Sequence, residues 1–247
     1  MTTLITGGTK GIGLGIARRL ARPGERLVLA YRSDEEAAEA ASAELTALGA
    51  AVTTIRTDVG DIDAVAGLMA EVEALGGGLS HIVHSAAMIY PTSLLGSDLR
   101  RFTQAIHANG LSLLYLVQPA MKLMQRGGSI VFISSAGARQ PSANYGALGV
   151  GKALAESLLK YLVAELAPRG IRINAVSPGL VATTSVSAMV GSQEAAERLF
   201  ERSARANPSG RMSNDDDYAA VVEFLLSPAA AFVQGQVIHA NGGSYVG

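Results

Sequence analysis

Residues 3–13 read TLITGGTKGIG, and this stretch decides the fold. A short apolar run typical of a β-strand leads directly into a glycine-rich turn, and a helical pattern begins near Ile12. The glycine spacing is G-x3-G-x-G, which differs from the G-x-G-x-x-G of the dehydrogenase fingerprint. Glycines there allow a tight turn and let a pyrophosphate approach the free N–H groups at the helix N-terminus. The stretch predicts a dinucleotide site, although a purely structural turn could use the same glycines.

The rest of the chain repeats this alternation of strand and helix. The strand patterns are apolar on both faces and are separated by helical patterns of ten or more residues, which indicates a parallel sheet with helices on both faces. We predict one α/β domain over residues 1–247 with a seven-stranded parallel sheet. The strands are expected near 3–6, 26–31, 51–57, 80–84, 129–133, 171–176 and 236–239, and the helices near 12–21, 34–48, 61–75, 97–108, 111–125, 145–166 and 218–226.

Composition excludes several classes of function. The 20 basic and 21 acidic residues give a net charge of −1, so we expect no nucleic-acid or membrane partner. The absence of cysteine excludes disulfides, thiolate metal sites and a cysteine nucleophile. We expect a cytoplasmic protein, because neither a signal peptide nor a membrane span is recognisable.

Metal binding is also not expected. The four histidines lack the spacing of metal ligands, and the acidic run 215–217 fits the first turn of the following helix.

The end of the second strand indicates which dinucleotide binds. An NAD-binding domain places an acidic residue there, whereas this strand ends Ala30-Tyr31-Arg32-Ser33. Arg32 and Lys10 could pair with a ribose 2′-phosphate, which favours NADP(H), although each could also be a solvated surface cation. Asp58 and Val59 follow the third strand and could touch the adenine, or Asp58 could cap a helix.

With Tyr145, Lys152, Pro178 and Gly179 in this order after the glycine turn, the chain resembles the short-chain dehydrogenase/reductase family over its entire length. The resemblance implies a Rossmann fold and three catalytic residues, Ser135, Tyr145 and Lys152. In that family the serine and tyrosine contact the substrate oxygen, and the lysine binds the nicotinamide ribose and lowers the tyrosine pKa. It also implies cofactor contacts at Gly7, Thr9, Lys10, Gly11, Ile12, Gly13, Arg32, Asp58, Val59, Ala86, Tyr145, Lys152, Pro178, Gly179, Val181 and Thr183.

The spacing between tyrosine and lysine suggests a particular reaction. Most of the family has Tyr-x3-Lys, whereas this chain has Tyr145-x6-Lys152, with Leu148 at the usual tyrosine position. Tyr-x6-Lys is the pattern of enoyl-acyl-carrier-protein reductases, and the surrounding sequence resembles the type III (FabL-like) group. On one helix, Tyr145 and Lys152 would share a face. We expect an NADPH-dependent enoyl-thioester reductase, with carbonyl reduction of a 3-oxoacyl thioester, polyketide or small ketone as the alternative.

Other positions depart from the family pattern. Residues 84–87 read HSAA where the family has Asn-Asn-Ala-Gly. A count back from Ser135 puts His107 at the place of the family's catalytic asparagine, and Asn109 is expected to face elsewhere. Residues 184–210 are expected to form a mobile substrate lid, although an ordinary surface loop with a helix near 194–206 is also compatible. The resemblance further implies an acyl-thioester substrate, with acyl carrier protein as a carrier of the thioester, and a homotetramer.

Overall fold

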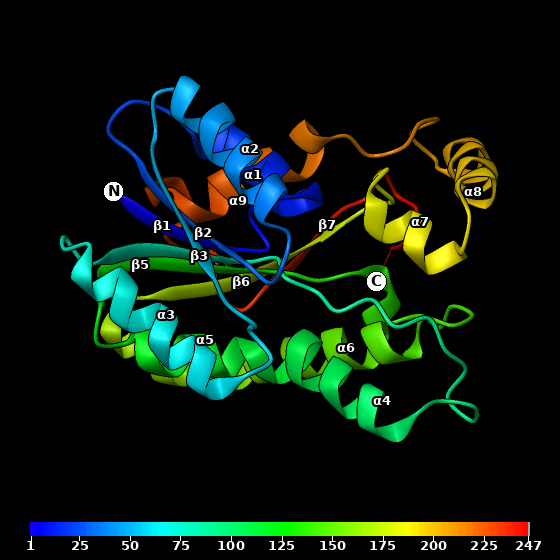
Figure 1. Cartoon of the computed structure of the whole chain (residues 1–247), viewed down its shortest axis with the longest axis horizontal. Coiled ribbons are helices and arrows are strands. Elements are labelled where there is room, and N and C mark those ends of the chain that lie inside the picture. The colour runs from blue at the N-terminus through cyan, green and yellow to red at the C-terminus, as the bar shows by residue number, and fades with distance from the viewer. Residues whose placement is uncertain (247) are drawn as a thin grey trace.

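The computed structural model describes residues 1–246, whose seven strands form one parallel sheet in the order β3-β2-β1-β4-β5-β6-β7. The predicted fold class is confirmed: this is a single Rossmann-like α/β domain with helices on both faces of the sheet (Figure 1). The strands are β1 (Thr2–Thr6), β2 (Arg26–Tyr31), β3 (Ala51–Arg56), β4 (Leu79–His84), β5 (Met124–Ile133), β6 (Arg172–Pro178) and β7 (Val237–Ala240).

Each face of the sheet has its own apolar core, because successive side chains of a strand point to opposite faces. Leu4 packs with the helices on one face, and its neighbour Ile5 packs with those on the other. In Figure 1 one layer contains α1 (Gly11–Leu20), α2 (Glu35–Ala47) and α9 (Asp215–Leu226). The opposite layer contains α3 (Ile62–Ala74), α4 (Leu99–Ile106), α5 (Ser112–Ala120) and α6 (Gly146–Leu166).

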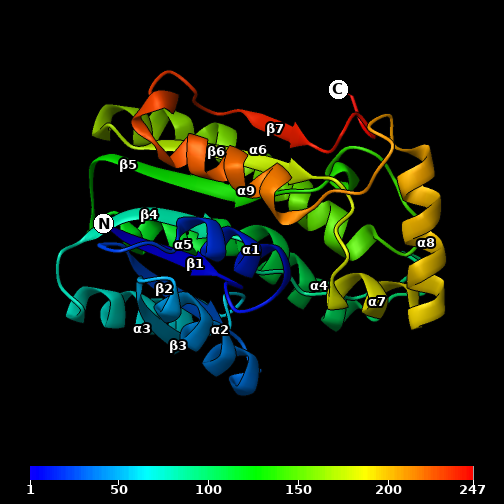
Figure 2. The same cartoon turned by 90° about the horizontal axis from the view of Figure 1, so that it is seen from above.

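The strand order places the expected binding site. From β1 the chain proceeds outward to β2 and β3 and then returns to β4 on the other side of β1. In a doubly wound sheet, ligands bind beyond the carboxyl ends of the strands at this reversal. Figure 2 shows the strands pointing toward α7 (Thr184–Val190) and α8 (Gln193–Ala206), which stand beyond that edge of the sheet. The segment expected to form a lid therefore contains two helices.

Two boundaries differ from the prediction. The helix expected over 111–125 ends at Ala120, next to Pro119, and β5 already begins at Met124. Before α5, residues His107–Leu111 form a π-helical turn, which a periodicity of 3.6 residues does not reveal.

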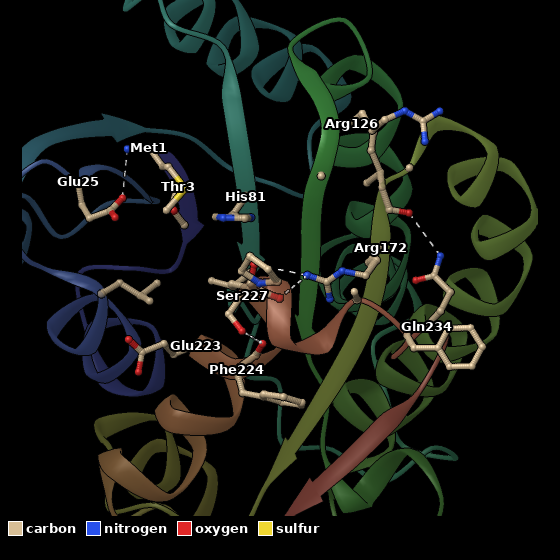
Figure 3. Close-up of a pocket in the computed structure, with 18 of the residues that line it drawn as sticks. Met1, Thr3, Glu25, His81, Arg126, Arg172, Glu223, Phe224, Ser227 and Gln234 are labelled. Atoms are coloured by element: carbon tan, nitrogen blue, oxygen red, sulfur yellow. Dashed lines mark hydrogen bonds and ion pairs between the residues drawn. The ribbon is translucent and has the colours of Figure 1, made fainter.

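The opposite edge of the sheet holds a cavity of about 1070 Å³ (Figure 3). Its lining comes from the amino ends of strands and from the end of α9, and includes His81, Arg172, Glu223 and Phe224. The Arg172 guanidinium donates to three successive carbonyls at the end of α9, from Leu225 to Ser227. Its charge therefore stabilises the negative end of that helix dipole.

Among residues 1–246, none of the helices is long and apolar enough to cross a membrane.

Candidate active site

The glycine turn after β1 fits the close approach of a ligand backbone. Gly7 has a φ of +67°, and a Cβ on it would lie 2.9 Å from the Ala86 Cα. A Cβ on Gly13 would lie only 2.1 Å from the Gly7 carbonyl oxygen. Gly11 has a φ of +51° and faces Thr183, the residue directly before α7. Side chains larger than hydrogen would therefore fill or distort this turn.

The N-terminus of α1 suits an anion. Lys10 precedes the helix, no side chain among residues 1–246 caps it, and its first turn contains no acidic residue. The first N–H groups of a helix lack intrahelical partners and carry partial positive charge. Together with the glycines, this arrangement fits the pyrophosphate of a dinucleotide.

Lys10 and Arg32, the two basic residues expected to pair with a ribose 2′-phosphate, lie in different environments. Lys10 Nζ is 2.6 Å from Asp34 Oδ2 in an exposed ion pair, so part of its charge is neutralised within the protein. Arg32 is exposed, and its carbonyl accepts a hydrogen bond from Arg56 Nε at 3.2 Å. Arg56 is a second guanidinium at the end of the neighbouring strand, which the sequence reasoning missed; its β3-end position was the available signal.

The other expected cofactor residues border the same edge of the sheet. Asp58 accepts from the Gly60 N–H at 2.9 Å and forms a turn, whereas the helix cap of α3 is Asp61. Val59 is buried in the core.

The expected nicotinamide loop follows β6 at this edge. Gly179 donates its N–H to the Ala240 carbonyl at 3.0 Å. A Cβ on Gly179 would lie 2.3 Å from Ser213 Oγ, so the loop after Pro178 packs tightly there. Val181 is buried, and Thr183 ends the loop at the start of α7.

Tyr145 and Ser135 are brought together. The Tyr145 hydroxyl lies 3.0 Å from Ser135 Oγ. Tyr145 is the N-cap residue of α6, so the helix expected from 145 begins one residue later, at Gly146. Asn144 before it has a φ of +58°, a left-handed conformation that asparagine tolerates better than most residues. This turn aims the phenol at the serine loop.

Two glycines seat the Tyr145 ring. A Cβ on Gly137 would lie 2.3 Å from Tyr145 Cε1. A Cβ on Gly149 would lie 2.5 Å from the Gly137 carbonyl oxygen. The Gly137 N–H also donates to Ser135 Oγ at 3.1 Å. The ring therefore rests on bare backbone beside Ser135.

Lys152 is a buried cation on α6. Its Nζ donates to the Ile133 carbonyl at 2.7 Å and lies 4.4 Å from the Phe132 ring centroid. Burial lowers the pKa of Lys152 to about 7. Burial also raises the pKa of Tyr145, which the hydrogen bond with Ser135 partly counters. The lowering of the Tyr145 pKa by Lys152 stays a prediction.

The π-helical turn corrects the assignment of the asparagine. Asn109 is fully buried; its amide accepts from the Met88 N–H at 2.8 Å and donates to the Met88 carbonyl at 3.0 Å. It also packs against Gly151, next to Lys152. His107 instead lies beside Tyr115, with Nδ1 3.3 Å from its hydroxyl. The additional residue in the π turn rotates Asn109 toward the interior, so the expectation that it faces elsewhere was wrong.

His84, which departs from the family motif, joins two parts of the site. Its Nδ1 lies 2.6 Å from Thr6 Oγ1, at the start of the glycine turn, and its Nε2 lies 2.8 Å from Ser112 Oγ on α5. The ring is fully buried. Burial, aided by the charge of Lys152, lowers the pKa of His84 to about 3, so the ring is neutral at physiological pH.

Metal ligands do not gather in the described chain: across residues 1–246, no group of three or more His, Cys, Asp or Glu side chains could hold a metal ion.

The doubly wound sheet, the glycine turn and the pairing of Ser135 with Tyr145 fit a dinucleotide-dependent oxidoreductase. Residues 7–245 match the family model described as enoyl-(acyl carrier protein) reductase. The chain belongs to the short-chain dehydrogenase/reductase family and is an NAD(P)-dependent oxidoreductase.

Known relatives point to more than one reaction. The chain is 33% identical over 250 residues to the 3-oxoacyl-[acyl-carrier-protein] reductase FabG of Staphylococcus aureus, covering 99% of this chain and 98% of that protein. An enoyl-[acyl-carrier-protein] reductase (NADH) from Aquifex aeolicus is similar in structure, with a TM-score of 0.86, 27% identity and coverage of 100% and 97%. A short-chain dehydrogenase from Burkholderia cenocepacia in complex with NADP has a TM-score of 0.87, 29% identity and coverage of 98% and 96%.

Proposed function

We propose that this protein uses NADPH to reduce the double bond of a 2-enoyl thioester, with Ser135, Tyr145 and Lys152 as its catalytic residues. The observation that carries the proposal is the placement of Tyr145. Its hydroxyl reaches Ser135 from the residue before α6, while the usual tyrosine position holds the buried Leu148. Because Tyr145 stands three residues before the usual position, its hydroxyl approaches the substrate from a different point, which suits a reaction in which the stabilised carbonyl oxygen and the reduced Cβ are separate parts of the substrate.

NADPH, when bound, supplies the hydride. The glycine turn and the N-terminus of α1 would hold its pyrophosphate, and Arg32 and Arg56 would face the 2′-phosphate, since both lie where β2 and β3 end. Lys152 would bind the nicotinamide ribose. The pairing of Lys10 with Asp34 leaves the choice of NADP(H) over NAD(H) resting mainly on the two arginines.

The two hydroxyls act on the substrate oxygen. Because Ser135 Oγ and Tyr145 OH are 3.0 Å apart, both could donate to one thioester oxygen. Addition of the hydride at Cβ makes negative charge develop on that oxygen as an enolate forms. A preformed donor stabilises this charge more strongly than it stabilises the neutral carbonyl, which lowers the barrier.

Reduction of a 3-oxoacyl thioester is the second candidate. Two hydroxyls that converge on one oxygen also suit a ketone, and the Staphylococcus aureus relative is named for that reaction. An acyl carrier protein as carrier of the thioester, a lid over 184–210 and a homotetramer in the cytoplasm stay predictions.

One assay separates the candidates. NADPH oxidation is measured with a crotonyl and an acetoacetyl thioester side by side. We expect a higher kcat/KM for the crotonyl thioester. Efficient reduction of the acetoacetyl thioester with no reduction of the crotonyl thioester would replace the first candidate by the second.

A further inference from the structure

The loop that carries Ser135 is fastened at both ends to one buried carboxylate. Ser134 Oγ donates to Glu156 Oε1 at 2.5 Å, and Arg139 Nε lies 3.0 Å from Glu156 Oε2. Between these two anchors lie Ser135, which bonds the Tyr145 hydroxyl, and Gly137, which seats the Tyr145 ring. The Glu156 side chain therefore links the two ends of residues 134–139, which we call the serine loop.

Glu156 also links this loop to the catalytic lysine. It lies four residues after Lys152 on α6, so both side chains are on one face of that helix. Its side chain is only 7% exposed, and a carboxylate buried to this extent needs charged or polar partners. Both of its anchors are hydrogen bonds to an ionised group, the stronger kind. The serine loop is thus held at a fixed place relative to Lys152.

Tyr245, near the end of the chain, lies close to Arg139, the outer of the two anchors. Burial opposes the charge of Arg139, but Glu156, with a smaller contribution from the nearby Tyr245 phenol, raises the pKa of that arginine. The Tyr245 ring in turn packs on His239 of β7, with ring centroids 4.8 Å apart.

We propose that Glu156 is a positioning residue for catalysis. It acts through Ser134 and Arg139, which set the place of the Ser135 hydroxyl and the Tyr145 ring relative to Lys152. This inference rests on the proposed function, because it assumes that those three residues are catalytic. It predicts that loss of Glu156 slows the chemical step and leaves cofactor binding nearly intact.

Two variants weaken the links that hold the serine loop, one at Glu156 and one at Arg139. Glu156→Gln keeps an oxygen acceptor for Ser134 but removes the charge that holds Arg139. Arg139→Gln removes the outer anchor at a more exposed position, which keeps the test usable if Glu156→Gln folds poorly. The matched control is Glu223→Gln, since Glu223 also holds two partners, Arg19 Nε at 2.7 Å and an Arg22 nitrogen at 2.9 Å. Glu223 lines the cavity at the opposite edge of the sheet (Figure 3).

Each variant is assayed with whichever of the crotonyl or acetoacetyl thioesters the wild type reduces. The readouts are kcat, the isotope effect with NADPH deuterated at the transferred position, the NADPH dissociation constant and Tm. We expect Glu156→Gln and Arg139→Gln to lose about tenfold or more in kcat, since small misplacements are costly. We also expect a larger isotope effect and an NADPH affinity within about threefold of wild type, because the chemical step alone is impaired.

Three outcomes would count against these ideas in different ways. If Glu156→Gln and Arg139→Gln lower Tm as the control does but keep the wild-type kcat and isotope effect, Glu156 is only structural and the inference is overturned. If Tyr145→Phe, measured in parallel, keeps the wild-type kcat, the catalytic assignment itself fails. A loss of NADPH binding as large as the loss of kcat would also contradict the inference.

Discussion

Replacement of Gly137 by alanine would test how the Tyr145 ring is seated. The added Cβ would lie 2.3 Å from Tyr145 Cε1 and 2.6 Å from Cδ1, whereas ordinary contacts begin near 3.4 Å. The ring must therefore retreat by about 1 Å, or the loop must move by a similar distance. Either response separates the Tyr145 hydroxyl from Ser135, because Gly137 and Ser135 share one short loop.

A misplacement of about 1 Å can cost about 10²-fold in rate, so we expect kcat to fall by roughly one to two orders of magnitude. The glycine turn lies elsewhere, so NADPH affinity is expected to change little. The assay combines steady-state NADPH oxidation with a titration of NADPH binding.

Gly67→Ala is the matched control, because a Cβ at this position on α3 meets nothing within 4 Å. We expect this control to keep its kcat and to gain about 0.5–1 kcal/mol of stability, since alanine favours a helix over glycine. If Gly137→Ala also keeps the wild-type kcat, the reasoning on the ring is refuted.

Three further predictions concern charge and pH. The pKa of Lys152 falls from 10.5 to about 7 on folding, so between pH 7 and 10 the unfolded state binds more protons than the folded state. The free energy of unfolding of the cofactor-free protein should therefore rise with pH over this range. Lys152→Met should reduce that rise, as measured by denaturant unfolding at a series of pH values. The pKa of His84 falls from 6.5 to about 3, so stability should decline as the pH falls below 6.5; His84→Asn should decline less steeply, and equal slopes would contradict this. Arg32→Ala should raise the KM for NADPH about ten- to hundredfold and leave that for NADH nearly unchanged, because only NADPH carries the 2′-phosphate; equal effects on both would exclude a phosphate contact.

The fold was predictable because its signals are local and repeated. Apolar runs between helical patterns indicated the parallel sheet, and the glycine turn after the first strand indicated a dinucleotide site. Element boundaries were less predictable. The helix expected over 111–125 ends at Ala120, next to Pro119, whereas the apolar residues Leu123 and Met124 continued the helical pattern in the sequence although β5 begins at Met124.

The site was predictable where a motif carried it and not where packing decided it. Ser135 and Tyr145 meet as the family resemblance implied. Asn109 was misjudged because a π turn changes the direction of a side chain without a signal in composition. Glu156 was overlooked because a glutamate on a helix is usually solvated, and only its spacing of four residues from Lys152 hinted otherwise.

The central claim is that the Tyr145 hydroxyl stabilises the charge that develops on a thioester oxygen during enoyl reduction. The most direct test is kcat/KM for a crotonyl thioester in wild type and Tyr145→Phe, with NADPH binding measured on both proteins. We predict turnover by the wild type and a loss of about 10²–10³-fold in the variant, the usual effect of removing one oxyanion donor, with NADPH affinity unchanged. A wild type inactive toward the crotonyl thioester, or a variant as active as the wild type, would contradict the claim.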